Sequence, residues 1–142
     1  MTFEEILPGV EVGQTFGPFD LVINSDLNEQ YLFALRDFDN RYTESDGEAT
    51  PLVHPGVLLN ASMTVMMKFK PGQGWTGFHG RDEIEWFEPA KVDEKMQVTY
   101  EVVELLEKRG RPWWIREARI TNASGELKLR RRIHTAFLKN VQ

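Results

Sequence analysis

The 142-residue sequence contains no cysteine. This absence excludes disulfide bonds, thiolate metal sites and cysteine nucleophiles. Histidine is scarce too, because only His54, His79 and His134 can offer an imidazole for chemistry near neutral pH. No apolar run approaches the roughly 20 residues that a membrane-spanning helix needs. We therefore expect a protein without thiol chemistry and without a membrane segment.

Basic residues are scarce at the start of the chain. Residues 1–50 contain eleven acidic and two basic residues, whereas residues 51–142 contain eleven acidic and fifteen basic ones. The formal net charge of −5 and the lack of a recognisable DNA- or RNA-binding motif argue against a nucleic-acid partner. The basic end of the chain, with Lys128, Arg130 and Arg132, indicates either a solvated charged face or a patch for a phosphate-bearing ligand.

The composition is that of an ordinary globular protein, with 41% hydrophobic and 27% charged residues. This length fits one domain, which we place at residues 1–142. The first residues, MTFEEILPG, carry two acids where a signal peptide needs positive charge. We therefore expect a cytoplasmic location.

Helical spacing appears in two segments of the first half. Tyr31, Leu32 and Leu35 predict a helix near residues 26–36, with Ser25 or Asp26 as its N-cap. Residues 56–69 are apolar nearly all round, which predicts a buried helix. The polar, turn-rich segment between the two helices is a candidate functional loop, and the Gly-containing segment 70–80 is a candidate lid.

Residues 21–23 form a short strand-like run, and the second half of the chain has the pattern of strands. Extended or alternating segments at residues 82–88, 96–108, 113–121 and 127–138 predict an antiparallel meander. Helices followed by strands favour the α+β class. The economical way to bury the 56–69 helix is to curl the sheet around it. Arg131 interrupts the apolar face of the last strand, so this side chain needs a partner or an opening to solvent.

Two short segments could carry chemistry. The sequence RDFDNRY places Asp37 and Asp39 two residues apart, which is compatible with an acid–base set or with an ordinary acidic turn. His54 and Gly56 stand where the buried helix begins. Free N–H groups at a helix start can stabilise a developing oxyanion, although they can equally serve only as a cap.

Four segments, in this order, resemble one known family: PGVEVGQTF, RDFDNRY, TPLVHPGVLLNAS, and the long block that begins EIEWFEPAKVDEKMQVTY. Over roughly residues 8–138 the chain resembles the MaoC-like dehydratases, a group that includes the (R)-specific enoyl-CoA hydratases. The resemblance implies a single hotdog domain, in which a curled antiparallel sheet wraps a central helix, here about residues 56–69. It also implies a homodimer or a larger hotdog assembly.

The resemblance implies an activity as well. Members of this family hydrate 2-enoyl thioesters or dehydrate 3-hydroxyacyl thioesters, carried by CoA or by acyl carrier protein. No metal or redox cofactor is implied. Lys128, Arg130 and Arg132 are candidates for contacts with CoA phosphates, on the strength of the charge distribution alone.

Asp37 matches the aspartate of the family's catalytic motif, whereas Tyr42 stands where the family has histidine. The replacement matters because an unperturbed phenol has a pKa of about 10 and an imidazole one of about 6.5. The helix-entry loop also has an additional residue, Pro55, which lacks an N–H. Gly56 or Val57 is then the candidate oxyanion donor.

Three readings of these departures stay open. His54 takes over as the base while Asp37 orients it, and Tyr42 or His54 is the proton-transfer partner. Alternatively, the protein is a non-catalytic subunit that binds acyl thioesters beside a catalytic partner. In the third reading it is a thioesterase with Asp37 as base. Fold alone does not decide among these.

Overall fold

The computed structural model describes residues 2–43, 50–64 and 70–141. Four helices and five strands are described, in the order α1 (Phe3–Ile6), β1 (Thr15–Leu21), α2 (Ser25–Leu35), α3 (Asn40–Thr43), α4 (Pro55–Thr64), β2 (Trp75–Trp86), β3 (Met96–Lys108), β4 (Arg111–Asn122) and β5 (Leu127–Lys139). No described helix is long and apolar enough to cross a membrane.

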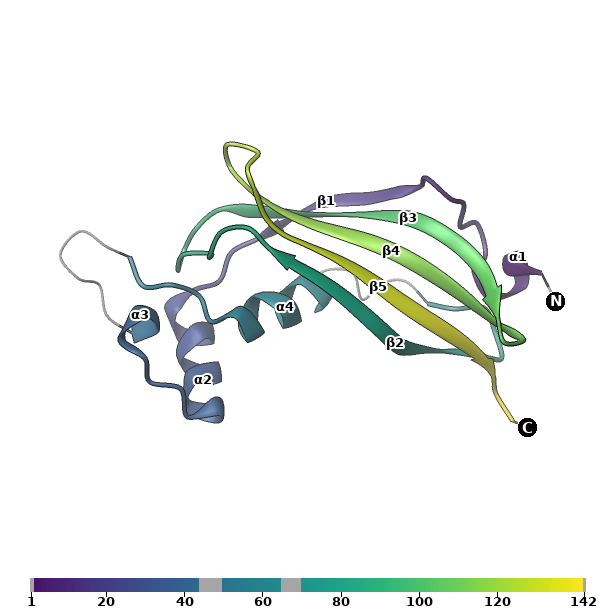
Figure 1. The fold of residues 1–142 in the computed structure, drawn as a ribbon, viewed down its shortest axis with the longest axis horizontal. Coiled ribbons are helices and arrows are strands. Elements are labelled where there is room, and N and C mark those ends of the chain that lie inside the picture. Colours follow the sequence, from purple (N-terminus) through teal and green to yellow (C-terminus); the bar gives the residue numbers. More distant parts are fainter. Residues whose placement is uncertain (1, 44–49, 65–69, 142) are drawn as a thin grey trace.

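The five strands form one antiparallel sheet with the order β1-β3-β4-β5-β2. The strands β1 and β2 are therefore the two edges. Figure 1 shows that the sheet curls over α4, while α2 and α3 lie at one end and both termini at the other. This is the curled sheet around a central helix that the sequence predicts.

Alternation in the sequence accounts for the strands. Met96, Val98, Tyr100 and Val102 are buried on the inner face of β3, whereas the intervening Gln97 and Glu101 share the outer face. Successive side chains on a strand point to opposite faces, so one face of the sheet can be apolar and the other polar. The predicted strands at 96–108, 113–121 and 127–138 are confirmed as β3, β4 and β5.

The helix α4 packs one face against the sheet. Val57, Leu58 and Ser62 are fully or almost fully buried there, whereas Pro55 and Asn60 are exposed. The predicted helix 56–69 is thus confirmed in its first half, and residues 65–69 lie outside the described residues. Within the described half the helix is buried on one side rather than all round, because Asn60 faces away from the core.

The helix α2 spans Ser25–Leu35, within one residue of the predicted 26–36. Its N-cap is Asn24, whose side chain accepts a hydrogen bond from the Leu27 N–H at 2.8 Å, instead of the expected Ser25 or Asp26. The helix ends at Arg36, which adopts a left-handed conformation with φ 54°.

Two sequence expectations about the edge strands are wrong. The strand predicted at 82–88 is confirmed over residues 82–86, but β2 begins earlier, at Trp75. Residues 75–79 pair with β5 and do not form a lid loop. β1 lies at Thr15–Leu21, earlier than the expected strand at 21–23. Both edge strands contain glycine, which lowers strand propensity and masks the alternation that marks the inner strands.

Candidate functional site

The structure brings Asp37 and His54 together. Asp37 follows the left-handed end of α2, and its carboxylate Oδ1 accepts the Asp39 N–H at 3.3 Å. Its other oxygen, Oδ2, lies 3.2 Å from Nε2 of His54, which immediately precedes α4. The side chains of Asp37 and His54 are 39% and 18% exposed. The pair is therefore held in place but open to a ligand.

The hydrogen bonds of His54 define its tautomer. Its Nδ1 accepts the Gly56 N–H at 3.0 Å, so Nδ1 carries no proton in this arrangement. The proton of the neutral ring then lies on Nε2 and points at the Asp37 carboxylate. A carboxylate that accepts from one ring nitrogen leaves the other nitrogen as the basic one, which is the arrangement of an oriented general base.

Both candidate oxyanion donors bond to His54. The Gly56 N–H donates to the ring, and the Val57 N–H donates to the His54 carbonyl at 3.0 Å. Stabilisation of a substrate oxygen by Gly56 therefore requires this N–H to leave the imidazole. The oxyanion role of Gly56 and Val57 stays a prediction.

Tyr42 packs against His54. The centres of the two rings are 5.1 Å apart, and the Arg41 guanidinium lies 5.8 Å from the Tyr42 ring. Arg41 is itself held by Asp39, and this hydrogen bond, together with one from the Arg41 N–H, lowers the pKa of the Asp39 carboxyl. Asp39 therefore forms an ion pair with Arg41, whereas Asp37 is the carboxylate that contacts His54.

Sequence reasoning missed the importance of Asn28. This side chain is 1% exposed, and both the oxygen and the nitrogen of its amide form hydrogen bonds. Its Oδ1 accepts the His54 N–H at 2.9 Å, and its Nδ2 donates to the carbonyls of Tyr42 and Leu52 at 3.3 and 3.1 Å. Asn28 thereby fixes α2, α3 and the segment before α4 to one another. The available signal was a polar residue one turn before Leu32, on the apolar side of the predicted helix.

A cavity of about 330 Å³ adjoins this group. Its walls are mostly apolar and include Tyr42, Leu58 and the half-exposed Trp86 and Phe87 at the end of β2. An apolar cavity with a few polar groups at its margin is typical of a small-molecule site.

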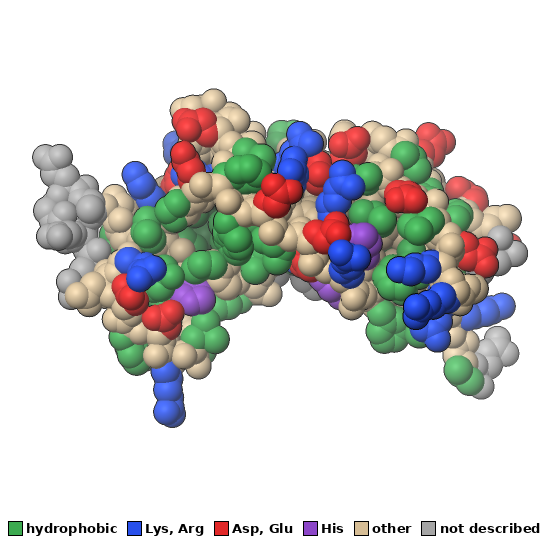
Figure 2. All heavy atoms as spheres, viewed as in Figure 1, with side chains coloured by type: hydrophobic (Ala, Val, Ile, Leu, Met, Phe, Trp, Pro, Cys, Tyr) green, Lys and Arg blue, Asp and Glu red, His purple; other side chains and the backbone are tan. Residues whose placement is uncertain are grey.

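The three predicted phosphate contacts have carboxylate partners in the structure. Lys128 is buried and lies 2.9 Å from Glu94, and it also donates to the Pro89 carbonyl. Arg130 binds Glu85 at 2.6 Å, and Arg132 binds the buried Glu117 at 3.3 Å. Figure 2 shows basic and acidic side chains interspersed on the visible face of the molecule. A role in phosphate binding stays a prediction and requires these ion pairs to open.

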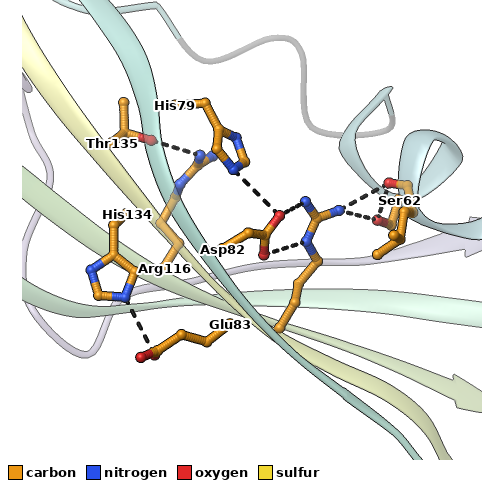
Figure 3. Close-up of polar contacts among 9 residues, drawn as sticks. Ser62, His79, Asp82, Glu83, Arg116, His134 and Thr135 are labelled. Atoms are coloured by element: carbon orange, nitrogen blue, oxygen red, sulfur yellow. Dashed lines mark hydrogen bonds and ion pairs between the residues drawn. The ribbon is translucent and has the colours of Figure 1, made fainter. Parts of the chain in front are cut away.

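Arg131 has the partner that its position on the apolar face requires. Its guanidinium binds the Asp82 carboxylate of β2 through two nitrogens. It also donates to the Leu59 carbonyl at 2.9 Å and the Ser62 hydroxyl at 3.1 Å, both on α4. Figure 3 shows the guanidinium between Asp82 and Ser62, with His79 on the other side of the Asp82 carboxylate. The buried ion pair thus anchors α4 to the sheet.

A second buried arginine lies in the same region. Arg116 donates to the Thr135 hydroxyl at 3.4 Å, and its guanidinium lies 4.4 Å from the Trp114 ring. Burial lowers the pKa of Arg116 to about 10, and burial likewise raises the pKa of Tyr100 to about 12. Arg116 stays cationic and Tyr100 stays neutral at pH 7. The described residues contain no group of three or more side chains arranged to hold a metal.

Comparison with known proteins rests on structure. No protein-family model matches the chain, and no curated protein matches it in sequence. An (R)-hydratase from Pseudomonas aeruginosa superposes with a TM-score of 0.72 and 15% identity, covering 94% of this chain and 89% of that one. A MaoC-like dehydratase from Rhodospirillum rubrum gives 0.70 and 14%, covering 96% and 98%.

The chain has the hotdog fold. A third similar structure is a 3R-hydroxyacyl-ACP dehydratase complex from Mycobacterium tuberculosis, with a TM-score of 0.69 and 11% identity over 89% of this chain and 96% of that one. The predicted fold class is therefore confirmed, and the structural neighbours include the MaoC-like dehydratases and (R)-hydratases that the sequence resembles. At sequence identities this low, structural similarity establishes the fold but not the activity.

Proposed function

We propose that the protein is a hydratase or dehydratase of 2-enoyl or 3-hydroxyacyl thioesters, carried by CoA or by acyl carrier protein. The observation that carries this proposal is the 3.2 Å contact between Asp37 and His54 at the start of α4. Support also comes from the apolar cavity beside the pair and from structural neighbours that are hydratases and dehydratases.

The proposed hydration uses His54 as base and Asp37 as its orienting partner. Nδ1 of His54 takes a proton from water while the water oxygen bonds to C3 of the enoyl group. The electrons of the double bond then move toward the thioester carbonyl, whose oxygen accepts the Gly56 N–H that the imidazole has released. The imidazolium, stabilised by Asp37, returns the proton to C2. The product is the 3-hydroxyacyl thioester, and dehydration is the reverse.

Tyr42 is the alternative proton-transfer partner, and one substitution separates it from His54. The Tyr42 ring contacts the His54 ring, but no described hydrogen bond joins its hydroxyl to Asp37. Under the proposed mechanism Tyr42→Phe keeps most of the activity, whereas His54→Gln removes it. The reverse order of effects would assign proton transfer to Tyr42.

A direct assay tests the activity itself. Purified protein is mixed with crotonyl-CoA, and both the enoyl absorbance and the release of free thiol are followed. A hydratase lowers the absorbance without releasing thiol. Thiol release in step with the loss of the thioester would identify a thioesterase and contradict the proposal.

One observation favours a second candidate, a thioester-binding subunit of a larger enzyme. A similar solved structure is a dehydratase complex, and the sequence resemblance aligns Tyr42 with the motif histidine of the MaoC-like dehydratases. This candidate predicts no turnover of any enoyl-CoA by the protein alone, together with saturable binding of the same thioester in calorimetry. Turnover by the isolated protein would exclude it.

We also propose that two copies pair along β2. This strand is an edge, all but two of its twelve residues are exposed, and it carries the exposed apolar side chains of Phe78, Ile84 and Trp86. An exposed edge strand of this length is a template for pairing with another strand. Trp86 also lines the cavity, so a second copy on this edge would lie beside the proposed site.

A further inference from the structure

The turn between β3 and β4 concentrates positive charge. Lys108 and Arg111 face each other across the last pair of the hairpin, and Arg109 forms the turn with Gly110. All four residues are exposed. In Figure 1 this turn lies at the end of the sheet opposite α2 and α3, and Figure 2 shows Lys and Arg gathered at the same end. The charge cluster is therefore separate from the Asp37–His54 pair.

Arg109 occupies a position that its side chain does not favour. Its φ is 53° and that of Gly110 is 73°, the two positive angles of a tight two-residue hairpin turn. Asn, Asp and Gly dominate such positions because a larger side chain is strained there. The chain thus holds an arginine where the turn alone would favour asparagine, which points to a role for the guanidinium.

The three cations of the turn differ from the other bases on the same face of the sheet. Arg81, Arg119 and Arg132 each bind a carboxylate, at 2.8, 2.8 and 3.3 Å. Lys108, Arg109 and Arg111 form no ion pair with any residue in the described ranges. The neighbouring Glu107 does not neutralise them, because adjacent residues of a strand point to opposite faces.

Two cavities meet at this turn. One, of about 450 Å³, is lined by Lys108, Arg109, Arg111 and Trp113. The other, of about 280 Å³, shares Lys108 and Trp113 and adds the side chains of Leu106, Ile115, Arg81 and His134, with Gly80 at its wall. Trp113 sits directly on Gly80, where a Cβ atom would come within 2.5 Å of its ring. A strongly cationic cavity therefore adjoins one with apolar walls and polar edges.

We propose that these two cavities form a nucleotide-binding site, with the phosphates at Lys108, Arg109 and Arg111 and the base beside Trp113. Guanidinium and ammonium groups are the usual partners of phosphate oxygens. The second cavity combines flat apolar walls with the hydrogen-bonding groups of Arg81 and His134. A nucleobase, with apolar faces and polar edges, matches this wall better than an alkyl chain does.

The site does not rest on the proposed hydratase activity. The shared ligand chemistry is an adenosine diphosphate group, which a free nucleotide and the nucleotide end of CoA both carry. Binding of ADP and of CoA is therefore measured in parallel by calorimetry and by amide chemical shifts at residues 106–115. Saturable ADP binding with shifts confined to the hairpin and to Gly80–Asp82 is expected. Displacement of ADP by CoA would identify the source as CoA, and its absence would identify a free nucleotide.

The variants are chosen so that unfolding cannot imitate the result. Arg109→Asn places a favoured residue at the positive φ, so the fold should be at least as stable while ADP binding weakens. Lys108→Gln with Arg109→Asn and Arg111→Gln should weaken ADP binding at least tenfold. The matched control, Lys70→Gln with Lys91→Gln and Lys95→Gln, removes the same charge from exposed lysines elsewhere and should change the Kd less than twofold.

Three results would overturn the proposal. The first is no ADP binding at millimolar concentration. The second is equal weakening in the hairpin and control variants, because general attraction of anions would then explain it. The third is pyrophosphate binding as tight as that of ADP, since the base would then contribute nothing at Trp113.

Discussion

A single buried amide organises the candidate site. Asn28 bonds to the main chain at Tyr42, Leu52 and His54, so the relative positions of α2, α3 and the segment before α4 depend on one side chain. None of these contacts touches the reacting groups, and Asn28 is therefore a positioning residue. Its three hydrogen bonds also explain how a short helix and two loops keep the His54 ring at one place relative to Asp37.

Asn28→Ser should lower both stability and activity. The change leaves the His54 N–H and two carbonyls without their partner, and a buried unsatisfied group costs about 1–3 kcal/mol. Urea denaturation measures the loss in the free energy of unfolding. The control Asn40→Ser removes an exposed amide and should change stability by less than about 0.5 kcal/mol. Equal stability of the two variants would contradict the role given to Asn28.

At the scale of elements, the sheet holds α4 through a buried ion pair. The Arg131–Asp82 pair spans β5 and β2, and Arg131 also reaches two residues of α4. The arginine was visible in the sequence as a break in an apolar face. Its partner was not, because Asp82 lies 49 positions earlier and the register of β2 against β5 sets their proximity.

Asp82→Asn should destabilise the fold strongly. Removing one member of a buried pair leaves an uncompensated charge and costs roughly 3–5 kcal/mol. Glu85→Gln is the matched control, since it breaks the exposed Arg130–Glu85 pair on the same two strands and should cost no more than about 1 kcal/mol. Chemical denaturation of the two variants gives the comparison, and similar losses would refute the anchoring role.

Glu117 of β4 makes a pH-dependent contribution to the stability of the fold. Burial alone would raise its pKa, but hydrogen bonds from Arg119 and Arg132 outweigh burial and hold the pKa below the usual value. A carboxyl whose pKa falls on folding stabilises the protein above its unfolded pKa of about 4.3 and loses that effect as the pH drops through the lower folded value.

The wild-type protein should therefore be more stable than Glu117→Gln at pH 7, and the difference should shrink as the pH falls below about 4. Urea denaturation of both proteins across pH 3–7 measures it. A difference that stays constant through this range would show that the charge of Glu117 contributes nothing.

The inner elements were more predictable than the edges. Alternation located β3, β4 and β5, and helical spacing located α2 to within one residue. The position of β1 and the first half of β2 were missed because glycines hide the alternation, and pairing with β5 rather than local pattern defines Trp75–His79 as strand. The sequence left the pairing of Asp37 with His54 as one of several alternatives, because the loop geometry that Asn28 sets cannot be inferred from residue spacing.

At the scale of the whole molecule, β2 leaves the sheet incomplete. Among the described residues this twelve-residue strand pairs only with β5, and its other side is the edge of the sheet. Soluble proteins rarely leave such an edge unprotected. The exposed aromatic residues Phe78 and Trp86 add apolar area to the same edge.

Size-exclusion chromatography with light scattering should therefore give twice the mass of one chain. Phe78→Lys with Ile84→Lys places like charges along the edge and should yield monomers. The control Phe33→Lys changes a 70% exposed aromatic residue on α2 and should leave the dimer intact. A wild-type monomer at micromolar concentration would exclude pairing through β2.

The central claim is that Asp37 and His54 act together on an acyl thioester. The most direct test is the initial rate of crotonyl-CoA hydration by the wild type, by Asp37→Asn and by Asp39→Asn. Asp37→Asn should lower the rate at least a hundredfold, because His54 loses the carboxylate that orients it and stabilises its charge. Asp39→Asn should keep the rate within a few-fold, since Asp39 binds Arg41. Equal rates for all three proteins would contradict the account.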